Sequence, residues 1–304
     1  MTHTIRTVVA ALFATFACVQ AASAMPATTT SRYVNTVDYT THYNEGCAQG
    51  RANLGGLVIL DFGQPWYQNG TYGTYLVTPL VFVTNAQIQT AVQGYLDGFW
   101  NCSGSTAQLR LGVGTNNYSY RSPQVTAGAG QAWGQMINSL NAYISSKGYA
   151  SQEFIRGAND MELDWNYAST TRQWLDAYAA ATSQPLYDYG DAAGCPPYGS
   201  CDNGWTQNDV WYVAWGSPVA HPVPEIYTAD GGTTNEWYSL SLYSYLNHGG
   251  RMDILLAFTQ YAACGCGSGT LTPAQAFGQL QTKLQSDSRT SQPLYYSSDI
   301  TYAN

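Results

Sequence analysis

Short apolar runs alternate along this chain with stretches in which apolar residues recur at helical spacing. Residues 57–60 form a continuous apolar run, typical of a strand buried on both faces, and the run ends at Asp61. In residues 84–100 the apolar side chains fall three or four positions apart, and Thr84 stands where a helix N-cap is expected. The pattern therefore predicts a strand followed by an amphipathic helix.

The same alternation continues to the end of the chain. It predicts strands at residues 57–60, 109–113, 154–163, 185–189, 210–215, 223–227, 254–258 and 293–302, and helices at 84–100, 130–147, 171–181, 237–246 and 272–284. Eight strands interleaved with helices favour an α/β fold, a single-domain (β/α)8 TIM-type barrel over residues 46–304. An open doubly wound sheet is the alternative, although such sheets usually carry a Gly-rich phosphate turn after the first strand. Here that turn reads Asp-Phe-Gly-Gln-Pro.

The first 24 residues have the layout of a secretory signal peptide. A polar stretch with a single Arg6 precedes an apolar run over residues 8–19, and Ala22-Ser23-Ala24 provides small residues for cleavage. The apolar run is shorter than the ~20 residues needed to span a bilayer. We therefore expect a secreted, extracellular protein without a membrane span, beginning with a polar, loose lead-in over residues 25–45.

Six cysteines follow this segment, an even number in a chain expected to be exported, so disulfides are expected. Their spacing favours a short loop closed by Cys195 and Cys201 and a long-range link between Cys47 and Cys102, although other pairings are possible. Cys264 and Cys266 could form a disulfide or a metal or redox site, and export favours the disulfide. Residues 191–208 lack a helical pattern and contain the short cysteine loop, so we expect an insertion on the barrel rim.

Composition and missing motifs narrow the chemistry. The 19 acidic residues outnumber the 11 basic ones, and this charge repels phosphate backbones, so we expect no nucleic-acid partner. The sequence contains no phosphate-binding G-x-x-x-x-G-K-[ST], no G-x-S-x-G elbow and no H-E-x-x-H zinc motif. We therefore expect no cofactor and no metal, and chemistry that depends on carboxylates. We also expect a monomer. The 25 tyrosines provide an aromatic, polar surface suited to glycans.

The strongest chemical pattern is residues 157–165, at the carboxyl end of a predicted strand. Alternation along a strand places Asp160, Glu162 and Asp164 on one face, with neighbouring Cα atoms about 6.6 Å apart. Like charges at this spacing raise one another's pKa, and barrel active sites lie at this end of the strands. The alternatives are a solvated strand end or carboxylates paired with Arg156 and Arg172.

Glu225 is the second candidate, because it emerges between apolar strand residues in a region rich in tryptophan; its alternative is a charge capping a strand end. Two carboxylates that flank a glycosidic bond are the usual equipment for cleaving it. We assign Asp160, Glu162 and Glu225 as catalytic candidates. The candidate substrate-binding residues are Asp61, Trp165, Tyr187, Asp188, Trp211, Trp215, Tyr227 and Gln260, with Asp191 on the same rim.

Residues 157–165, 203–207, 211–216 and 224–227 resemble a group of exported bacterial glycoside-hydrolase-like (β/α)8-barrel proteins, most of them without an assigned activity; the match spans roughly residues 50–285. The resemblance implies a carbohydrate-active barrel. The Asp160-x-Glu162 pair is similar to the D-x-E strand ends of lysozyme-type and chitinase-type barrels. It departs from the chitinase D-x-x-D-x-D-x-E run, whose first and last acids it lacks.

Three hypotheses follow. The preferred one is a glycoside hydrolase of cell-wall or plant polysaccharide, with Glu162 as general acid and Asp160 or Glu225 as nucleophile or base. The second is a non-catalytic barrel that binds polysaccharide or the cell wall. The third is a scaffold stabilised by calcium at Asp160, Glu162 and Asp188.

Overall fold

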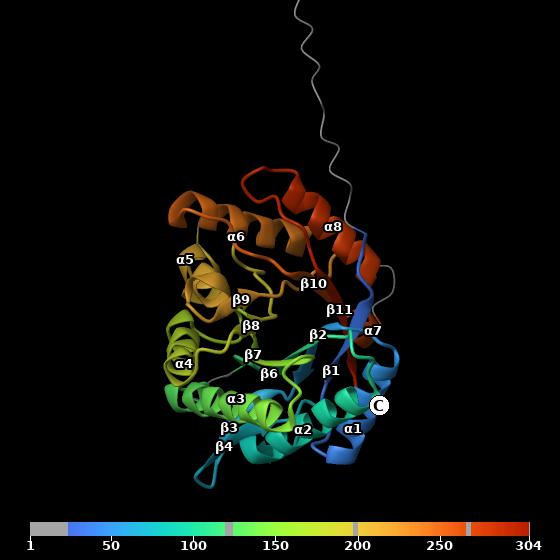
Figure 1. Cartoon of the computed structure of the whole chain (residues 1–304). Helices are drawn as coiled ribbons and strands as arrows, with labels where there is room; N and C mark the ends of the chain where they lie inside the picture. The colour runs from blue at the N-terminus through green and yellow to red at the C-terminus, as the bar shows by residue number, and fades with distance from the viewer. Residues whose placement is uncertain (1–23, 119–123, 197–199, 266–268, 304) are drawn as a thin grey trace, which may run out of the picture.

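Eight parallel strands form a sheet that closes on itself in the computed structural model, which describes residues 24–118, 124–196, 200–265 and 269–303 (Figure 1). Neighbouring strands pair in the order β10-β11-β1-β2-β6-β7-β8-β9, and all pairs are parallel. The strands are β1 (Thr28–Tyr33), β2 (Gly56–Asp61), β6 (Leu109–Asn116), β7 (Glu153–Asp160), β8 (Leu186–Asp188), β9 (Ala220–Pro222), β10 (Leu256–Thr259) and β11 (Tyr296–Tyr302).

The barrel closes just beyond β9, where a parallel bridge joins Glu225 to Phe258 of β10. The backbone N–H of Ile226 donates to the carbonyl of Phe258 at 2.8 Å, and the N–H of Phe258 donates to the carbonyl of Pro224 at 3.0 Å. With this closure each strand lies beside its predecessor in the βα order, which is the (β/α)8 arrangement expected from the sequence.

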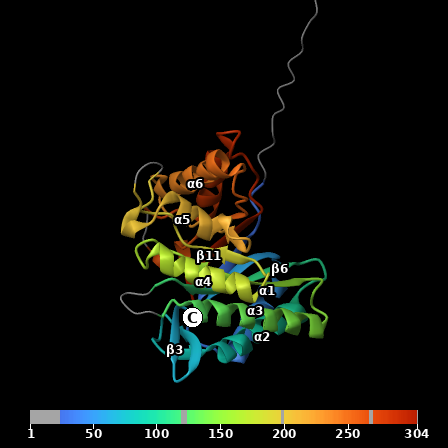
Figure 2. The same cartoon turned by 90° about the vertical axis from the view of Figure 1, so that its left-hand side faces the viewer.

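Helices surround the barrel (Figures 1 and 2). They are α1 (Tyr39–Arg51), α2 (Asn85–Cys102), α3 (Ala127–Lys147), α4 (Ala168–Ala181), α5 (Gln207–Trp211), α6 (Gly232–His248), α7 (Tyr261–Cys264) and α8 (Pro273–Gln285). Capping boxes at Thr84 and Thr272 start α2 and α8, and Gly148 ends α3 in the left-handed conformation with φ 77°. Strands β3 (Gln64–Gln68), β4 (Thr71–Tyr75) and β5 (Phe82–Thr84) form a small antiparallel sheet between β2 and α2.

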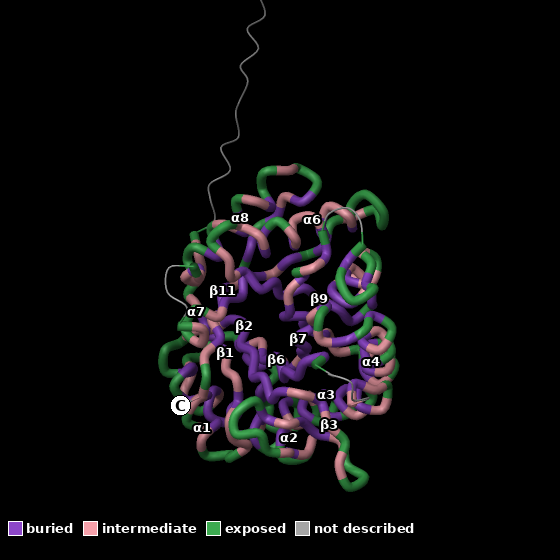
Figure 3. The backbone as a smooth tube through the Cα atoms, turned by 180° about the vertical axis from the view of Figure 1, so that it is seen from behind, coloured by how far each residue is buried: buried purple, intermediate pink, exposed green. Residues whose placement is uncertain are grey.

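The hydrophobic core consists of two clusters, an inner one inside the barrel and an outer one between the barrel and the helix layer. The buried residues lie around the centre of the molecule (Figure 3). Along β2, Leu57 and Ile59 belong to the inner cluster, whereas Val58 and Leu60 pack in the outer one. This explains the unbroken apolar run, because both faces of the strand are buried. The inner cluster consists of Leu57, Ile59, Ala158, Tyr187, Tyr189, Val223, Leu256, Phe258 and Ile300.

The expected loose lead-in over residues 25–45 is wrong, because this segment contains β1 and the start of α1. The buried polar residues of β1 have partners that a sequence pattern does not reveal. Thr29 donates its hydroxyl hydrogen bond to the carbonyl of Leu57. Ser31 lies 2.7 Å from the hydroxyl of Ser298 and accepts from the N–H of Ile59 at 2.8 Å. A hydrogen-bonded hydroxyl is tolerated inside a protein, so the strand needs no apolar run.

The strand predicted at residues 210–215 is also wrong, because α5 ends there and continues into a π-helical turn over Tyr212–Gly216. Its buried residues Val210, Val213 and Ala214 are spaced three or four positions apart, as on one face of a helix. The number of barrel strands was nevertheless predicted correctly, because this false strand offset the missed β1, whereas β3, β4 and β5 were not predicted. Elsewhere β7 ends at Asp160 rather than at residue 163, and β9 lies before rather than within residues 223–227.

Cys47–Cys102 and Cys195–Cys201 are disulfides, the two pairings that the spacing favoured. The first joins α1 to the end of α2, and the second closes the loop after β8. Cys264 is also disulfide-bonded, whereas Cys266 and residues 1–23 of the expected signal peptide lie outside the described residues. No helix in the described part of the chain combines the length and apolar character that crossing a bilayer requires.

Candidate active site

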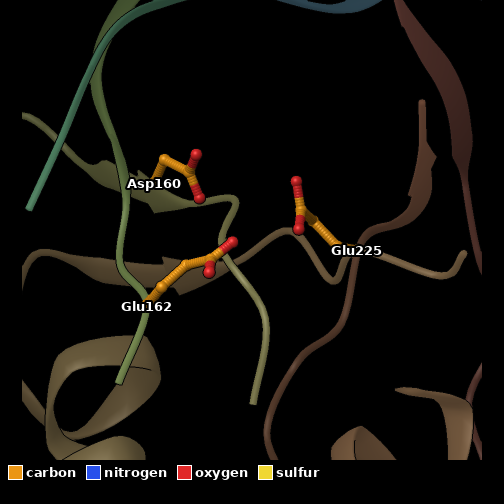
Figure 4. A group of neighbouring side chains, drawn as sticks. All are labelled: Asp160, Glu162 and Glu225. Carbon is orange, nitrogen blue, oxygen red and sulfur yellow. The ribbon is translucent and has the colours of Figure 1, made fainter. Parts of the chain in front are cut away.

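Three carboxyl groups converge at the carboxyl ends of the strands. Asp160 is the last residue of β7, Glu162 lies in the turn that follows it, and Glu225 follows β9. One oxygen from each lies within 4.8 Å of the others. Asp160 and Glu162 approach from one side and Glu225 from the other (Figure 4). The strand end therefore brings together the three residues named as catalytic candidates.

The turn that carries Glu162 is held by Asn117, a buried residue just beyond β6. The Asn117 side-chain oxygen accepts from the N–H of Glu162 at 3.0 Å, and its amide nitrogen donates to the carbonyl of Glu162 at 2.9 Å. Asn166 donates in turn to the backbone carbonyl of Asn117 at 3.2 Å. Because β7 ends two residues earlier, this clamp rather than strand alternation sets the position of Glu162. It also leaves Asp164 exposed.

Glu225 is positioned by the closure of the barrel. Its neighbours Pro224 and Ile226 make the backbone hydrogen bonds to Phe258, and its own N–H donates to the carbonyl of Gly190 at 3.4 Å. The residue is thus anchored to β10 on one side and to the end of β8 on the other. Its side chain faces inward, with 2% of the residue exposed.

The three carboxylates lack basic partners within the described residues. Arg156 donates to the carbonyl of Ile155 and to Gln184, and Arg172 pairs with Asp209 at 2.7 Å. The alternative in which these arginines neutralise the acids is therefore wrong. Among the described residues, one oxygen of Asp160 and one of Glu225 are buried without a hydrogen-bond partner. Such groups are costly in an empty site and are satisfied when a ligand supplies the partner.

Burial raises the pKa of every acid in this cluster. Burial, followed by the charges of Asp191 and Asp164, raises the pKa of Glu162 to about 8. Burial, followed by the charge of Glu162, raises the pKa of Asp160 well above the usual range, and burial, followed by the charges of Asp160 and Glu162, does the same for Glu225. The cluster therefore keeps protons at neutral pH that isolated carboxylates would have lost, which is the condition for acid catalysis.

Further acids surround the three. Asp61 ends β2, accepts from the N–H of Gly63 at 2.7 Å, and has its pKa raised by burial to about 6. Asp188 ends β8, accepts from the N–H of Gly190 at 3.3 Å, and has its pKa raised by burial to about 7. Asp191 lies just beyond, and burial raises its pKa as well. Asp61, Asp188 and Asp191 therefore lie close enough for their charges to act on Asp160.

Of the other predicted substrate-binding residues, three lie at this end of the barrel. Trp165 follows Asp164 in the turn after β7 and packs edge-on against Tyr118, with ring centroids 5.8 Å apart. Tyr227 lies two residues beyond Glu225, and Gln260 follows β10. All three side chains are partly exposed.

The structure does not bring Tyr187, Trp211 or Trp215 to the carboxylates. Tyr187 is buried in the inner cluster of the barrel. Trp211 stacks on His248 with centroids 3.4 Å apart, in the helix layer. Trp215 precedes β9, whereas Glu225 follows it, so the strand separates the two. Tyr187 was expected on the rim because its strand ends there. Trp211 and Trp215 were expected there because their segment was predicted to be a strand.

Three residues of the site were not predicted: Asn117, Tyr189 and Tyr33. Tyr189 follows β8 and donates to the carbonyl of Thr115 at 3.0 Å. Tyr33 ends β1 and packs on the inner cluster of the barrel, and the charges of Glu225 and Asp160 add to burial in raising its pKa. Tyr189 ends the strand predicted at residues 185–189, so strand alternation was a usable sign there. Tyr33 gave none once β1 had been missed.

No family model matches the chain, and no curated protein matches it. Among solved structures, the endo-1,4-beta-mannanase from Rhizomucor miehei is similar at 10% sequence identity with a TM-score of 0.44, over 90% of this chain and 84% of that one. A likeness at this level carries no argument about activity. The assignment of the barrel rests on its own closed strand order, and the assignment of function on the carboxylates.

Proposed function

We propose that this protein is a glycoside hydrolase that uses Glu162 and Glu225 to cleave a glycosidic bond at the mouth of the barrel. The observation that supports this most is the convergence of three carboxyl oxygens within 4.8 Å at the carboxyl ends of the strands. Carboxylates on two sides of a gap suit a bond placed between them, one protonating the leaving oxygen and the other attacking the sugar.

Glu162 serves as the general acid. It is the least buried of the three, so it reaches a leaving group that extends toward solvent, and its pKa of about 8 keeps it protonated at neutral pH. In the first step its proton passes to the glycosidic oxygen as the bond from that oxygen to the anomeric carbon breaks. The Glu162 carboxylate left behind then removes a proton from water, whose oxygen attacks the anomeric carbon.

Glu225 serves as the nucleophile. Its carboxylate oxygen bonds to the anomeric carbon in the first step and is released when water attacks in the second. Asp160 lies beside both groups and retains a proton while Glu225 is ionised, because one negative charge is easier to hold in this buried cluster than two.

The spacing of the carboxyl groups favours retention of anomeric configuration. Carboxyl groups about 5 to 5.5 Å apart form a covalent glycosyl-enzyme, whereas about 6.5 to 9.5 Å leaves room for a water and gives inversion. Because one oxygen of each group lies within 4.8 Å of the others, we propose the retaining arrangement.

The site of action proposed here is outside the cell, on a polysaccharide. Two disulfides support it, because disulfides persist in oxidising compartments. The N-terminal segment read as a signal peptide agrees with export.

The test is hydrolysis of soluble hexasaccharides of β-1,4-linked glucose, mannose, xylose and N-acetylglucosamine, with reducing ends measured over time. Glu162→Gln and Glu225→Gln are expected to lower turnover at least about a thousandfold, since each removes a reacting group. Asp164→Asn is the matched control, an exposed acid in the same turn, and should keep nearly full activity. Hydrolysis that survives Glu162→Gln removes that residue from the mechanism, and glycan binding without hydrolysis favours the non-catalytic barrel.

A cation site is the second candidate, favoured by the absence of a basic partner for these acids within the described residues. Calcium takes six to eight oxygen ligands, and the three converging oxygens would supply part of such a set. The raised pKa values instead let the acids stay neutral by holding protons. Melting temperature measured with EDTA and with added calcium separates the two: we expect no change, and a rise with calcium supports the cation site.

A further inference from the structure

A cavity of about 290 Å³ opens at the carboxyl ends of β1 and β11, the end of the barrel that also carries the carboxylate cluster. It is lined by Tyr33, Val34, Asn35, Val77, Thr78, Tyr302 and Ala303. Tyr33 connects the cavity to the inside of the barrel, because the same side chain packs on the inner cluster. Burial, followed by the charges of Glu225 and Asp160, raises the pKa of this tyrosine. A ligand in the cavity therefore contacts a side chain that also borders the inside of the barrel.

The walls of the cavity are fixed by the sheet. Tyr33 and Tyr302 are paired residues of neighbouring strands, and their rings lie 5.2 Å apart at 34°. Ala303 donates its N–H to the carbonyl of Tyr33 at 3.0 Å, and Asn35 donates from its side chain to the carbonyl of Ala303 at 3.0 Å. Binding in such a preformed site costs little ordering of the protein.

The chemistry of the lining is that of a sugar subsite. Tyr302 is 52% exposed, so a large part of its surface stays open to solvent, and Val77 and Ala303 add apolar surface. Asn35 and Thr78 provide polar groups at the edge. A pyranose ring has an apolar face of C–H groups and an edge of hydroxyls, which match an aromatic wall with a few polar groups.

We propose that this cavity binds a sugar unit of the substrate chain, stacked on Tyr302, next to the unit held by the carboxylates. The proposal rests on the proposed function and specifies its substrate class: an oligosaccharide or polysaccharide that continues past the cleaved bond on the β1 side. Tyr118 and Trp165, beyond β6 and β7, provide a second aromatic pair across the mouth. We expect a chain that contacts both pairs to pass the carboxylates, so that the bond cleaved is an internal one.

The experiment compares Tyr302→Ala with Tyr295→Ala, a matched exposed tyrosine that precedes β11 and so lies at the other end of that strand. Affinity for the four hexasaccharides named above is measured by calorimetry in the Glu162→Gln background. Tyr302→Ala is expected to weaken binding of the preferred hexasaccharide about tenfold, the scale of one aromatic contact. Tyr302→Phe should restore it, because stacking needs the ring and not the hydroxyl.

A kinetic comparison in the active enzyme completes the test. Tyr302→Ala should reduce kcat/KM for the hexasaccharide about tenfold more than for the aryl glycoside of the same single sugar. Equal losses on both substrates, or binding no weaker than in Tyr295→Ala, overturns the subsite.

The same data separate this inference from the proposed function. If the wild type hydrolyses a hexasaccharide and Tyr302→Ala binds it with unchanged affinity, the subsite is rejected and the proposed hydrolase function is retained. Binding that depends on Tyr302, with no hydrolysis by the wild type, keeps the subsite and rejects the hydrolase. Failure of the wild type to bind or cleave any of the four hexasaccharides rejects both.

Discussion

In the proposed mechanism Glu162 and Glu225 need opposite protonation states at the same pH, because an acid must hold its proton while a nucleophile must have lost it. Burial raises the pKa of both, and because one negative charge is easier to hold in the cluster than two, the loss of a proton from Glu225 favours the protonated form of Glu162. Asn117 fixes the backbone of Glu162, so the position from which its side chain extends is set by the fold. The site thus obtains its acid from desolvation rather than from a basic neighbour.

The first prediction concerns pH. The proposed mechanism requires protonated Glu162, so kcat/KM should fall as pH rises through about 8. Glu162→Gln should keep a small activity on an aryl glycoside with a good leaving group, since such a leaving group needs no proton. The kcat/KM of this variant should no longer fall as pH rises through about 8. Initial rates between pH 5 and 10 measure both. An unchanged fall in Glu162→Gln assigns the titration to another group.

The second prediction concerns Glu153, an acid outside the site that is 1% exposed. Burial, then the charge of Asp97, raises its pKa to about 9, whereas Asp97 itself accepts from the hydroxyls of Tyr39, Tyr143 and Tyr149. Because the folded pKa lies above the unfolded one, the proton on Glu153 stabilises the fold at low pH. That contribution is lost as pH rises through about 9.

Glu153→Gln should therefore match the wild type near pH 4 and exceed its free energy of unfolding by about 1 to 3 kcal/mol near pH 9, the scale for an uncompensated buried group. Urea unfolding at the two pH values measures this. Asp253→Asn, whose side chain is 61% exposed, is the control and should change little. A gain that is equal at both pH values would show that titration of Glu153 is not its cause.

Among the elements, those with local signs were predictable. Helices α2, α3 and α8 carry caps at Thr84, Gly148 and Thr272, and β2 is an unbroken apolar run. Strand β1 was not predictable from its pattern, because Thr29 and Ser31 are satisfied by groups far away in the sequence. The segment 210–215 misled because its apolar residues fit a strand as well as one turn of helix.

The third prediction concerns the packing of α1 on α2. A Cβ at Gly46 would lie 2.0 Å from the carbonyl oxygen of Tyr95, in the backbone of α2, so Gly46→Ala must push the helices apart. We expect a loss of about 1 to 3 kcal/mol, the usual cost of overpacking. Gly278→Ala is the control, because that position in α8 faces open space.

Gly278→Ala should be neutral or stabilising by up to about 1 kcal/mol, the difference in helix propensity. Thermal unfolding of both variants checks the pair. Equal melting temperatures for the two would mean that α1 and α2 do not pack as closely as described.

At the scale of the whole molecule, the site exists only because the barrel closes. Asp160 and Glu225 are far apart in the sequence, and the bridge between Glu225 and Phe258 brings the second to the first. The residue types were predictable, since acids at strand ends are typical of barrel enzymes. The 4.8 Å limit on their separation was not, because it depends on which strands become neighbours and on the Asn117 clamp.

Trapping the glycosyl-enzyme tests directly whether Glu225 is the nucleophile. Glu162→Gln, treated with the dinitrophenyl glycoside of the preferred sugar, should form the covalent intermediate without acid assistance and release it slowly, because the base for water is missing. Rapid quenching and mass spectrometry should show one added glycosyl unit on the peptide that contains Glu225. An adduct on another residue, or turnover with inversion and no adduct, would contradict the account.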